Sequence, residues 1–224
     1  YSFGTQPEID PMVLVFLKHL VAKNAKIYAV SSVPDGPMLA ASTLGSYESL
    51  GKTYGVDYVN LGYFSGGEAG LAAFAKNVGS VFATDFDGKP VDELELMEGI
   101  NSIEDFDLVI SANSGPGNGA NVDAWVQQVA VPYHSKLLIA VTAIMFPRMA
   151  PFVQAGQVTA SIGGLRGGAE YERLFGTAGS ATLSMSAQSS AQLFLLILIL
   201  LGNVGYWLSL KKTAAGGMGD GHKS

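Results

Sequence analysis

Two glycine-rich segments contain the residue types and spacing that could bind a ligand in this 224-residue chain. Both segments follow an apolar run and lead into residues with helical spacing. In the first segment, Gly66 and Gly67 could present backbone N–H groups to an anion at a helix N-terminus. The carboxylate of the next side chain, Glu68, argues against phosphate as that anion.

The second segment, residues 113–121, is close to a dinucleotide-binding fingerprint but lacks the G-x-G-x-x-G spacing. It also follows the third expected strand, whereas that motif belongs to the first strand-to-helix turn. For both segments, tight turns that need glycine at positive φ are the favoured interpretation. Ligand binding at the two segments is the alternative, and its candidate residues are Gly66, Gly67, Asn113, Ser114, Gly115, Gly117 and Asn118.

Patterns of nucleophilic and metal-dependent catalysis are missing from the sequence. It contains no G-x-S-x-G, G-x-x-x-x-G-K-[ST] or H-E-x-x-H motif, and it has no cysteine for a thiolate metal site or a disulfide. His222 lies in the tail, His19 lies on an expected helix, and His134 precedes the amino end of a strand. We therefore predict no catalytic residue, no metal site and no cofactor.

Carboxylates are concentrated between residues 85 and 107, with Lys89 as the one basic residue among them. Residues 84–88 superficially resemble a calcium-binding loop, but the third ligand pair and the glutamate at loop position twelve are missing. A solvated acidic surface is the favoured interpretation. The residues concerned are Asp85, Asp87, Asp92, Glu93, Glu95, Glu98, Glu104, Asp105 and Asp107.

Alternating strands and helices are expected to position these segments. The strands are continuous apolar runs, which is typical of a parallel sheet covered on both faces. We therefore expect an open, mostly parallel, doubly wound (Rossmann-like) α/β sheet whose glycine-rich loops lie at the carboxyl ends of the strands. The expected strands are residues 26–33, 56–64, 107–112, 136–144 and 158–162. The expected helices are residues 10–22, 38–54, 67–78, 91–100, 122–129, 147–155 and 167–175.

Residues 193–210 form an uncharged apolar run. At 1.5 Å per residue, this run and the residues that lead into it are about long enough to cross a bilayer core of roughly 30 Å. Tyr206 and Trp207 lie near its end, where aromatic rings favour the headgroup level, and Lys211 and Lys212 follow. A buried core helix is the alternative, but such helices rarely reach this length without a polar face. We predict a transmembrane helix.

The charges on either side of this run predict its orientation. Lys211, Lys212 and Lys223 follow it with one acid, Asp220, so the positive-inside tendency makes the tail cytoplasmic and the preceding domain extracytoplasmic. Of the 13 basic and 19 acidic residues, three basic and one acidic lie after residue 190, which leaves a net charge of −8 on residues 1–190. Nucleic acid and anionic lipid, which need a basic surface, are therefore not expected partners of the domain.

The predicted organisation has four parts. Residues 1–178 are an extracytoplasmic α/β domain, residues 179–190 a linker, residues 191–210 the transmembrane helix and residues 211–224 the cytoplasmic tail. The fragment at residues 1–3 is of β type, so we expect the domain to be incomplete at its N-terminus. An export signal or anchor would precede it. The expected location is the cell (inner or plasma) membrane.

Several long stretches resemble an uncharacterised family of prokaryotic membrane-anchored proteins. They are PEIDPMVLVFLKHLVAKNAKI, YGVDYVNLGYFSGGEAGL, FATDFDGKPVDELELMEGI, FVQAGQVTASIGGLRGGAEYERLFG and AQSSAQLFLLILILLGNVGYW. The resemblance implies an apolar N-terminal segment, an α/β domain and a C-terminal span. It implies no activity, cofactor or catalytic residue.

Two functions are compatible with these observations. The favoured one is a non-enzymatic, membrane-anchored accessory or structural subunit of a membrane complex, whose partners are the lipid bilayer and other membrane-protein subunits, bound through the helix and tail. Gly202, Asn203 and Gly205 are the expected helix–helix contact, because small residues and an amide serve such contacts in lipid. Asn203 reaching the membrane interface is the alternative for that residue. The second function is an extracytoplasmic small-ligand-binding or hydrolytic domain tethered to the membrane.

Overall fold

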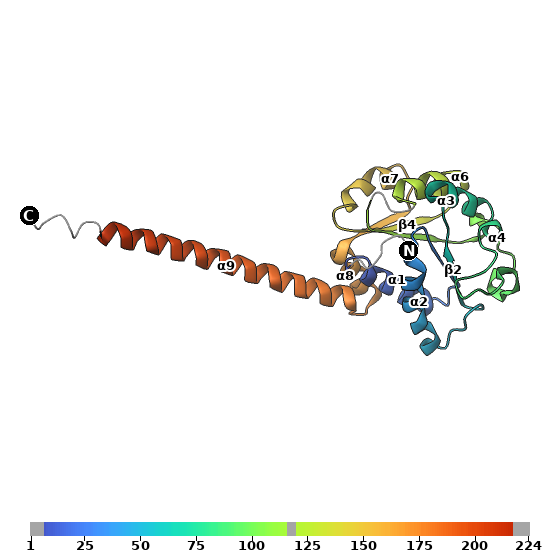
Figure 1. Cartoon of the computed structure of the whole chain (residues 1–224), viewed down its shortest axis with the longest axis horizontal. Coiled ribbons are helices and arrows are strands. Elements are labelled where there is room, and N and C mark those ends of the chain that lie inside the picture. Colours follow the sequence, from blue (N-terminus) through green and yellow to red (C-terminus); the bar gives the residue numbers. More distant parts are fainter. Residues whose placement is uncertain (1–6, 116–119, 217–224) are drawn as a thin grey trace, which may run out of the picture. The chain divides into compact units, whose positions relative to one another are not determined.

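The computed structural model describes residues 7–115 and 120–216, with side chains as far as residue 210. It contains two compact units, Tyr1–Thr182 and Leu183–Ser224, which are described separately below (Figure 1). The fragment at residues 1–3, together with Gly117, Asn118 and the lysines of the tail, lies outside the residues or side chains that the structure describes.

The first unit is a mixed α/β domain with two small parallel sheets. In one sheet β1 (Ile27–Ser31) pairs with β2 (Tyr58–Tyr63). In the other, β4 (Leu137–Val141) lies between β3 (Val109–Asn113) and β5 (Ala160–Gly163). The α/β class and the parallel pairing are thus confirmed, whereas the single continuous sheet that the sequence predicts is found as two separate sheets.

The helices alternate with these strands in chain order. The α-helices are α1 (Asp10–Ala22), α2 (Gly36–Leu44), α3 (Gly67–Lys76), α4 (Val78–Val81), α5 (Val122–Trp125), α6 (Val131–Tyr133), α7 (Ala150–Gln154), α8 (Gly164–Phe175) and α9 (Ser180–Gly216). The 3₁₀ turns are η1 (Gly45–Leu50), η2 (Val91–Glu93), η3 (Glu95–Met97), η4 (Ile103–Asp105) and η6 (Phe146–Met149). A π-helical segment, η5 (Val126–Ala130), joins α5 to α6.

Two of the expected helices differ most from the structure. The helix expected at residues 38–54 ends as α2 at Leu44 and continues only as η1, where the hydroxyls of Ser46 and Ser49 donate to main-chain carbonyls three residues back. Such local bonds compete with α-helical pairing. The acidic helix expected at residues 91–100 is wrong, because only η2 and η3 form there. Its carboxylates recur at spacing i, i+3, which destabilises a helix by like-charge repulsion.

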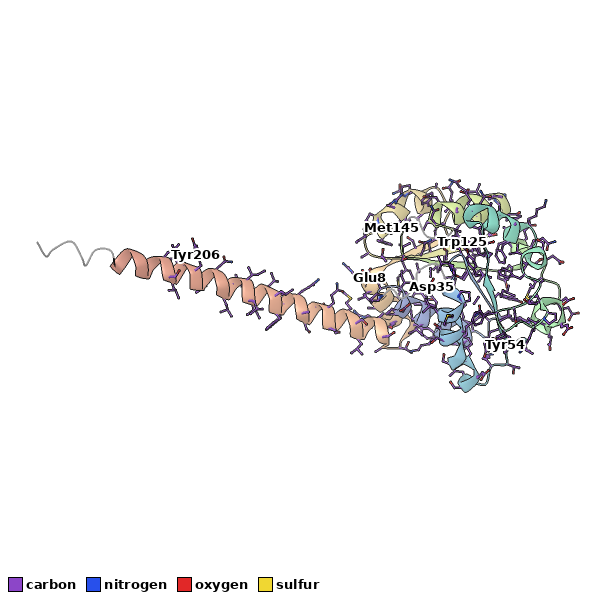
Figure 2. The ribbon with its side chains drawn as sticks, in the orientation of Figure 1. Glu8, Asp35, Tyr54, Trp125, Met145 and Tyr206 are labelled. Carbon is purple, nitrogen blue, oxygen red and sulfur yellow. The ribbon has the colours of Figure 1, made fainter. Side chains whose placement is uncertain are left out.

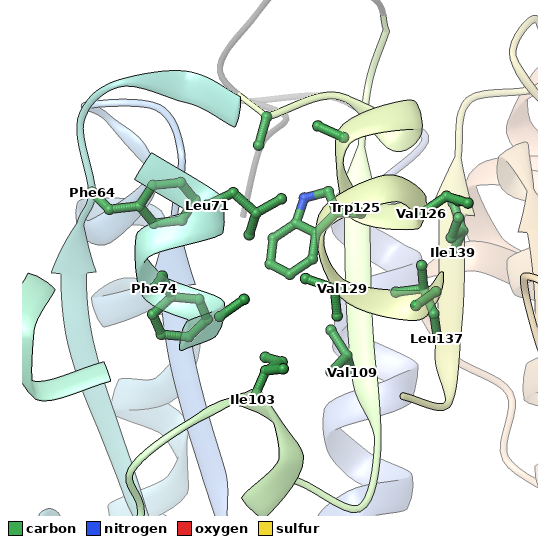
Figure 3. Packing of buried hydrophobic residues seen from close by; sticks show 14 of the residues in the cluster. Phe64, Leu71, Phe74, Ile103, Val109, Trp125, Val126, Val129, Leu137 and Ile139 are labelled. Carbon is green, nitrogen blue, oxygen red and sulfur yellow. The ribbon is translucent and has the colours of Figure 1, made fainter. Parts of the chain in front are cut away.

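The hydrophobic core lies on both faces of the three-stranded sheet. Alternate residues of β3 and β4 enter one of two clusters, as expected for strands covered on both sides. Helices α3 and α5 supply one cluster, in which Figure 3 shows the ring of Trp125 close to Leu71. Helices α1 and α2 supply the other cluster, which includes Met12, Phe16 and Leu44.

Helix α9 begins at Ser180 and runs through the second unit. Residues 180–190, which the sequence analysis assigns to a linker, are therefore helical. Its segment Ser180–Leu210 is long and apolar enough to cross a membrane, and no other helix in the described residues meets that test. The most apolar part of this segment is not buried within the chain at all.

Candidate functional site

The first glycine-rich segment forms the turn between β2 and α3 at the carboxyl end of β2. Gly66 and Gly67 have φ angles of 88° and 55°, which favour glycine. A Cβ atom at Gly70, one turn further on, would collide with the carbonyl oxygen of Ser65. The structure thus places Gly66 and Gly67 at the strand-to-helix turn that the sequence predicts, and backbone geometry accounts for both glycines.

The carboxylate of Glu68, beside this turn, is engaged by a neighbouring helical segment. The side-chain amide of Gln128, in η5, donates a hydrogen bond to Glu68 Oε1 over 2.8 Å. This contact ties the first turn of α3 to η5, against which α3 packs. The first turn of α3 therefore already carries a negative charge, which opposes the binding of a second anion there.

The second glycine-rich segment starts at the last residue of β3, Asn113, which is buried. Its amide nitrogen donates to the carbonyl of Ala120 over 3.2 Å, and its Oδ1 accepts from the N–H of Gly115 over 3.1 Å. The Thr142 hydroxyl, after β4, donates to the carbonyl of Ser114 over 3.3 Å. Asn113 therefore closes its own loop, as asparagine does in Asx turns.

Gly115 differs from Gly66 and Gly67. Its φ is not positive, and a Cβ atom there would meet none of the described residues within 4 Å. The sequence-based expectation that both segments need glycine at positive φ is therefore wrong for Gly115. Its two loop partners, Gly117 and Asn118, lie outside the described residues. The structure brings Asn113, Ser114 and Gly115 together at the end of β3, and it places Gly66 and Gly67 after β2.

Two polar residues that the sequence analysis missed also bond to main-chain groups near the ends of the strands. Asn60, buried within β2, donates through its amide to the carbonyl of Pro37 over 2.8 Å and accepts from the N–H of Gly62 over 3.2 Å. Glu8, labelled in Figure 2, accepts a 2.8 Å hydrogen bond from the N–H of Ala143, beyond β4. An asparagine inside an otherwise apolar strand was the available signal for Asn60. Nothing in the sequence pairs Glu8 with Ala143.

The described residues form a smaller cavity among helices and a larger one along two strands. The smaller one, of about 300 Å³, lies by the start of α5 and by η6 and α7, and Asp123 and Arg148 contribute charged groups to its lining. The larger one, of about 650 Å³, is lined by β1, β3 and α1, and by the residues just ahead of both strands. The larger cavity runs along β1 and β3 from the residues ahead of both strands, and the sequence analysis did not anticipate it.

The acidic segment is partly structural. Asp85 is 5% exposed, and it accepts hydrogen bonds from the Tyr54 hydroxyl over 2.8 Å and from the N–H groups of Asp87 and Lys89. Burial and the hydrogen bond to Asp85 raise the pKa of Tyr54. The interpretation as a solvated surface is thus wrong for Asp85, which organises its turn from within. In the described parts of the chain, no three His, Asp or Glu side chains are grouped so that they could hold a metal ion.

Glu172, on α8, is a buried carboxylate that the sequence analysis did not single out. It is 2% exposed and accepts from the N–H groups of Gly179, Ala181 and Thr182 over 2.8–3.0 Å, and from the Thr182 hydroxyl over 2.6 Å. Burial opposes its charge, but these hydrogen bonds outweigh burial and lower the pKa of Glu172. The carboxylate thus caps the first turn of α9, where N–H groups lack helical partners.

The two glycines proposed as contact residues of the second unit lie on one face of α9. At 100° per residue, Gly202 and Gly205 are about 60° apart, Asn203 lies about 100° from Gly202, and Val204 lies about 160° from Gly202. A Cβ atom at either glycine would meet nothing within 4 Å. The amide of Asn203 donates to the carbonyl of Ile199 over 2.9 Å, so one of its two donors is satisfied within the helix. This donor of Asn203 therefore does not require a partner helix.

Together these features define the class of protein: a mixed α/β domain followed by one apolar helix that could span a membrane. Comparisons with known proteins add no narrower identity. No family model, no curated protein and no solved structure matches the chain. The resemblance to prokaryotic membrane-anchored proteins therefore stays a prediction.

Proposed function

We propose that the chain is a non-enzymatic, membrane-anchored subunit of a larger membrane complex, with α9 as its transmembrane span. One observation carries the proposal: the apolar side chains of α9 are exposed within the chain. Residues such as Leu196, Leu200 and Leu201 are more than half exposed. Apolar surface of this extent is unfavourable in water and is stable in a bilayer or against other apolar helices.

The polar groups of the carboxyl edge support the non-enzymatic part of the proposal. Asn60, Asn113 and Glu8 each bond to the main chain of a neighbouring loop. These hydrogen bonds stabilise the loops at this edge. Such an edge suits the docking of another subunit.

We further propose that the two sheets are the halves of one doubly wound sheet. All three strand pairs are parallel, and β1 and β3 line the same cavity. Helices α1 and α2 supply one core cluster and α3 and α5 the other, as expected where helices cover both faces of a single sheet. The domain would then offer its carboxyl edge as one continuous surface.

The orientation proposal places the α/β domain outside the cytoplasm, because Lys211 and Lys212 directly follow the span. The absence of native cysteine allows a direct test. A single cysteine at exposed Asp92 should react with a membrane-impermeant maleimide added to intact cells, and a cysteine appended after Ser224 should react only after lysis. The reverse pattern would show that the orientation is wrong.

The assembly proposal is tested by extraction in a mild detergent, followed by identification of the chains that co-purify. We expect the double variant Gly202→Ile/Asn203→Leu to lose its partner chain through steric clash and a missing hydrogen bond. The space around Gly202 within the chain means that α9 itself tolerates the change. Val204→Ile, on the opposite side of the helix, is the matched control and should retain the partner. Equal retention by both variants would remove this contact from the proposal.

A second function, binding of a small ligand by the α/β domain, has one observation in its favour. The cavity of about 300 Å³ beside α5 is at the lower end of the range for small-molecule sites, and Arg148 and Asp123 give it charged groups. Native mass spectrometry of the purified chain would reveal a retained ligand as added mass. Loss of that mass in Arg148→Ala would assign the ligand to this cavity.

A further inference from the structure

The cavity of about 650 Å³ separates the two sheets, with β1 on one side and β3 on the other. Its lining is largely apolar and includes Ile27, Ala29, Ile110 and Ala112 from the two strands. Lys26 and Asp107, which lie just ahead of β1 and β3, line the same cavity. The two strands therefore begin at the same end of it, as neighbouring parallel strands of one sheet would.

Backbone groups of both strands are directed at this cavity. The N–H of Ile27 donates to the carbonyl of Asp57, beside β2, and the N–H of Val109 donates to the carbonyl of Lys136, beside β4. Successive residues of a strand in a parallel sheet direct their amide groups to opposite edges. The amide groups of Tyr28 and Ile110 thus point away from β2 and β4, to the edge that borders the cavity. Tyr28 and Ile110 are half-buried, and backbone groups there need hydrogen-bonding partners, from water or from another segment.

Helix α1 shows which part of the polypeptide could supply those partners. The hydrogen bond from Ala143 to Glu8 places the start of α1 at the carboxyl end of β4. The helix then runs back along the cavity, which Phe16 and Leu20 line, and leads into β1. A segment that enters a helix at the carboxyl edge and continues into a parallel strand is the second half of a β-α-β unit. The first strand of such a unit lies in the same sheet.

We propose that this cavity holds a β-strand contributed by the polypeptide directly ahead of Pro7, running parallel to β1 and β3. The other side of β1 is occupied by β2, which leaves the cavity side for the strand. The strand order then becomes β2, β1, new strand, β3, β4, β5, which is the order of a doubly wound sheet. This inference rests on the proposal above that the two sheets are halves of one doubly wound sheet. It adds that a strand joins those halves.

The inserted strand also defines a crevice. The order of strands reverses between the new strand and β3, and open α/β sheets bind ligands outside the carboxyl ends of the strands at such a reversal. Asn113, Ser114 and Gly115 lie at that end of β3. The candidate residues of the second glycine-rich segment thus flank the position at which a ligand of this fold would bind.

The test is amide hydrogen exchange on the whole chain in detergent. Tyr28 and Ile110 should exchange within about tenfold of their neighbours Ile27 and Val109, whose N–H groups bond across the existing strand pairs. That similarity would show that a strand fills the cavity. Exchange of Tyr28 and Ile110 at least about a hundredfold faster than Ile27 and Val109 would overturn the proposal.

A diazirine amino acid at Ile110 identifies the occupant in the intact chain. We expect photo-crosslinks to residues ahead of Pro7. Crosslinks to lipid, to a bound small molecule or to another polypeptide would overturn the proposal. A chain that begins at Pro7 provides a second readout, in which Tyr28 and Ile110 should lose at least about a hundredfold protection. Membrane association, measured separately by resistance to carbonate extraction, distinguishes failure of this inference from failure of the membrane proposal.

Discussion

The carboxyl edge of the strands and helix α9 differ in which side chains are buried and which are exposed. At the edge, Asn60 and Asn113 are buried and bond to loop carbonyls, so polar groups are used to build structure. Along α9, apolar side chains are exposed, and polar ones such as Asn203 and Ser209 bond back to their own helix. The polar groups Asn60 and Asn113 of the edge are hydrogen-bonded within the domain. The exposed apolar surface of α9, in contrast, is unfavourable in water. The difference makes α9 the part of the described chain that the membrane proposal depends on.

The largest expected effect comes from charging α9. Leu198→Asp combined with Leu201→Asp should release the protein from the membrane fraction, because each carboxylate near the centre of a span costs about 3 kcal/mol. Both leucines are about half exposed or more within the chain, so the α/β domain should still fold. Carbonate extraction measures membrane integration, and Leu198→Ile/Leu201→Ile is the control. If the charged variant stayed fully integrated in the membrane, the claim that α9 differs from the carboxyl edge in needing an apolar environment would be wrong.

The domain core should show the next largest effect. Trp125→Ala should lower the free energy of unfolding by about 3–5 kcal/mol, because the ring is buried in the cluster with Leu71 and Val129. The indole N–H of Trp125 bonds to none of the described residues, so Trp125→Phe loses no hydrogen bond and should cost about 1–2 kcal/mol. Denaturant unfolding monitors both. Similar losses for the two variants would contradict the packing argument.

A smaller effect is expected where the domain meets the first turn of α9. Glu172→Ala should destabilise that turn by about 2 kcal/mol, because buried N–H groups of Ala181 and Thr182 lose a charged acceptor. The pKa of Glu172 is lowered in the folded chain, so its stabilisation is present above the ordinary glutamate pKa and is lost as the pH falls through the lowered value. Protection of the Ala181 and Thr182 amides, measured as the exchange rate relative to an unstructured peptide at the same pH, should therefore fall only in acid, and in Glu172→Ala it should be low at every pH. Protection that falls towards alkaline pH instead would contradict the assignment.

The smallest effects distinguish the two glycine-rich segments. Gly67→Ala should cost about 1–2 kcal/mol, because φ is 55° there. Gly115→Ala should change stability by less than about 0.5 kcal/mol, because φ is not positive and the described surroundings leave room for the methyl group. Thermal unfolding of the two variants in one detergent gives the comparison. A larger loss for Gly115 would place it in the same structural role as Gly67.

The parts of the fold that follow from local patterns were predictable. The helix at residues 10–22 and the parallel strands agree with the structure, because apolar periodicity and turn residues act over short distances. The break between β1 and β3 was not predictable, because strand pairing joins residues distant in the sequence. The acidic helix failed because the helical spacing of its carboxylates outweighs three apolar anchors, Val91, Leu96 and Met97.

The candidate site was predictable only in part. The position of Gly66 and Gly67 follows from the run that ends in β2 and from the helix that begins at Gly67. The loop-closing bonds of Asn113 and the cap formed by Glu172 depend on acceptors and donors that only the folded chain brings together. From the sequence, a carboxylate such as Glu172 on a charged helix is predicted to lie at the surface. Its burial depends on the packing of α8 against the start of α9, which the sequence does not reveal.

The mass of the particle extracted from the membrane tests the central claim most directly. The chain alone has a mass of 23.4 kDa. After extraction in a mild detergent, native mass spectrometry should find it in a larger particle with at least one different membrane-protein chain in fixed ratio, and Gly202→Ile/Asn203→Leu should release it as a single chain. A wild-type particle with the mass of a single chain, or one made only of copies of this chain, would contradict the assignment as a subunit of a larger membrane complex.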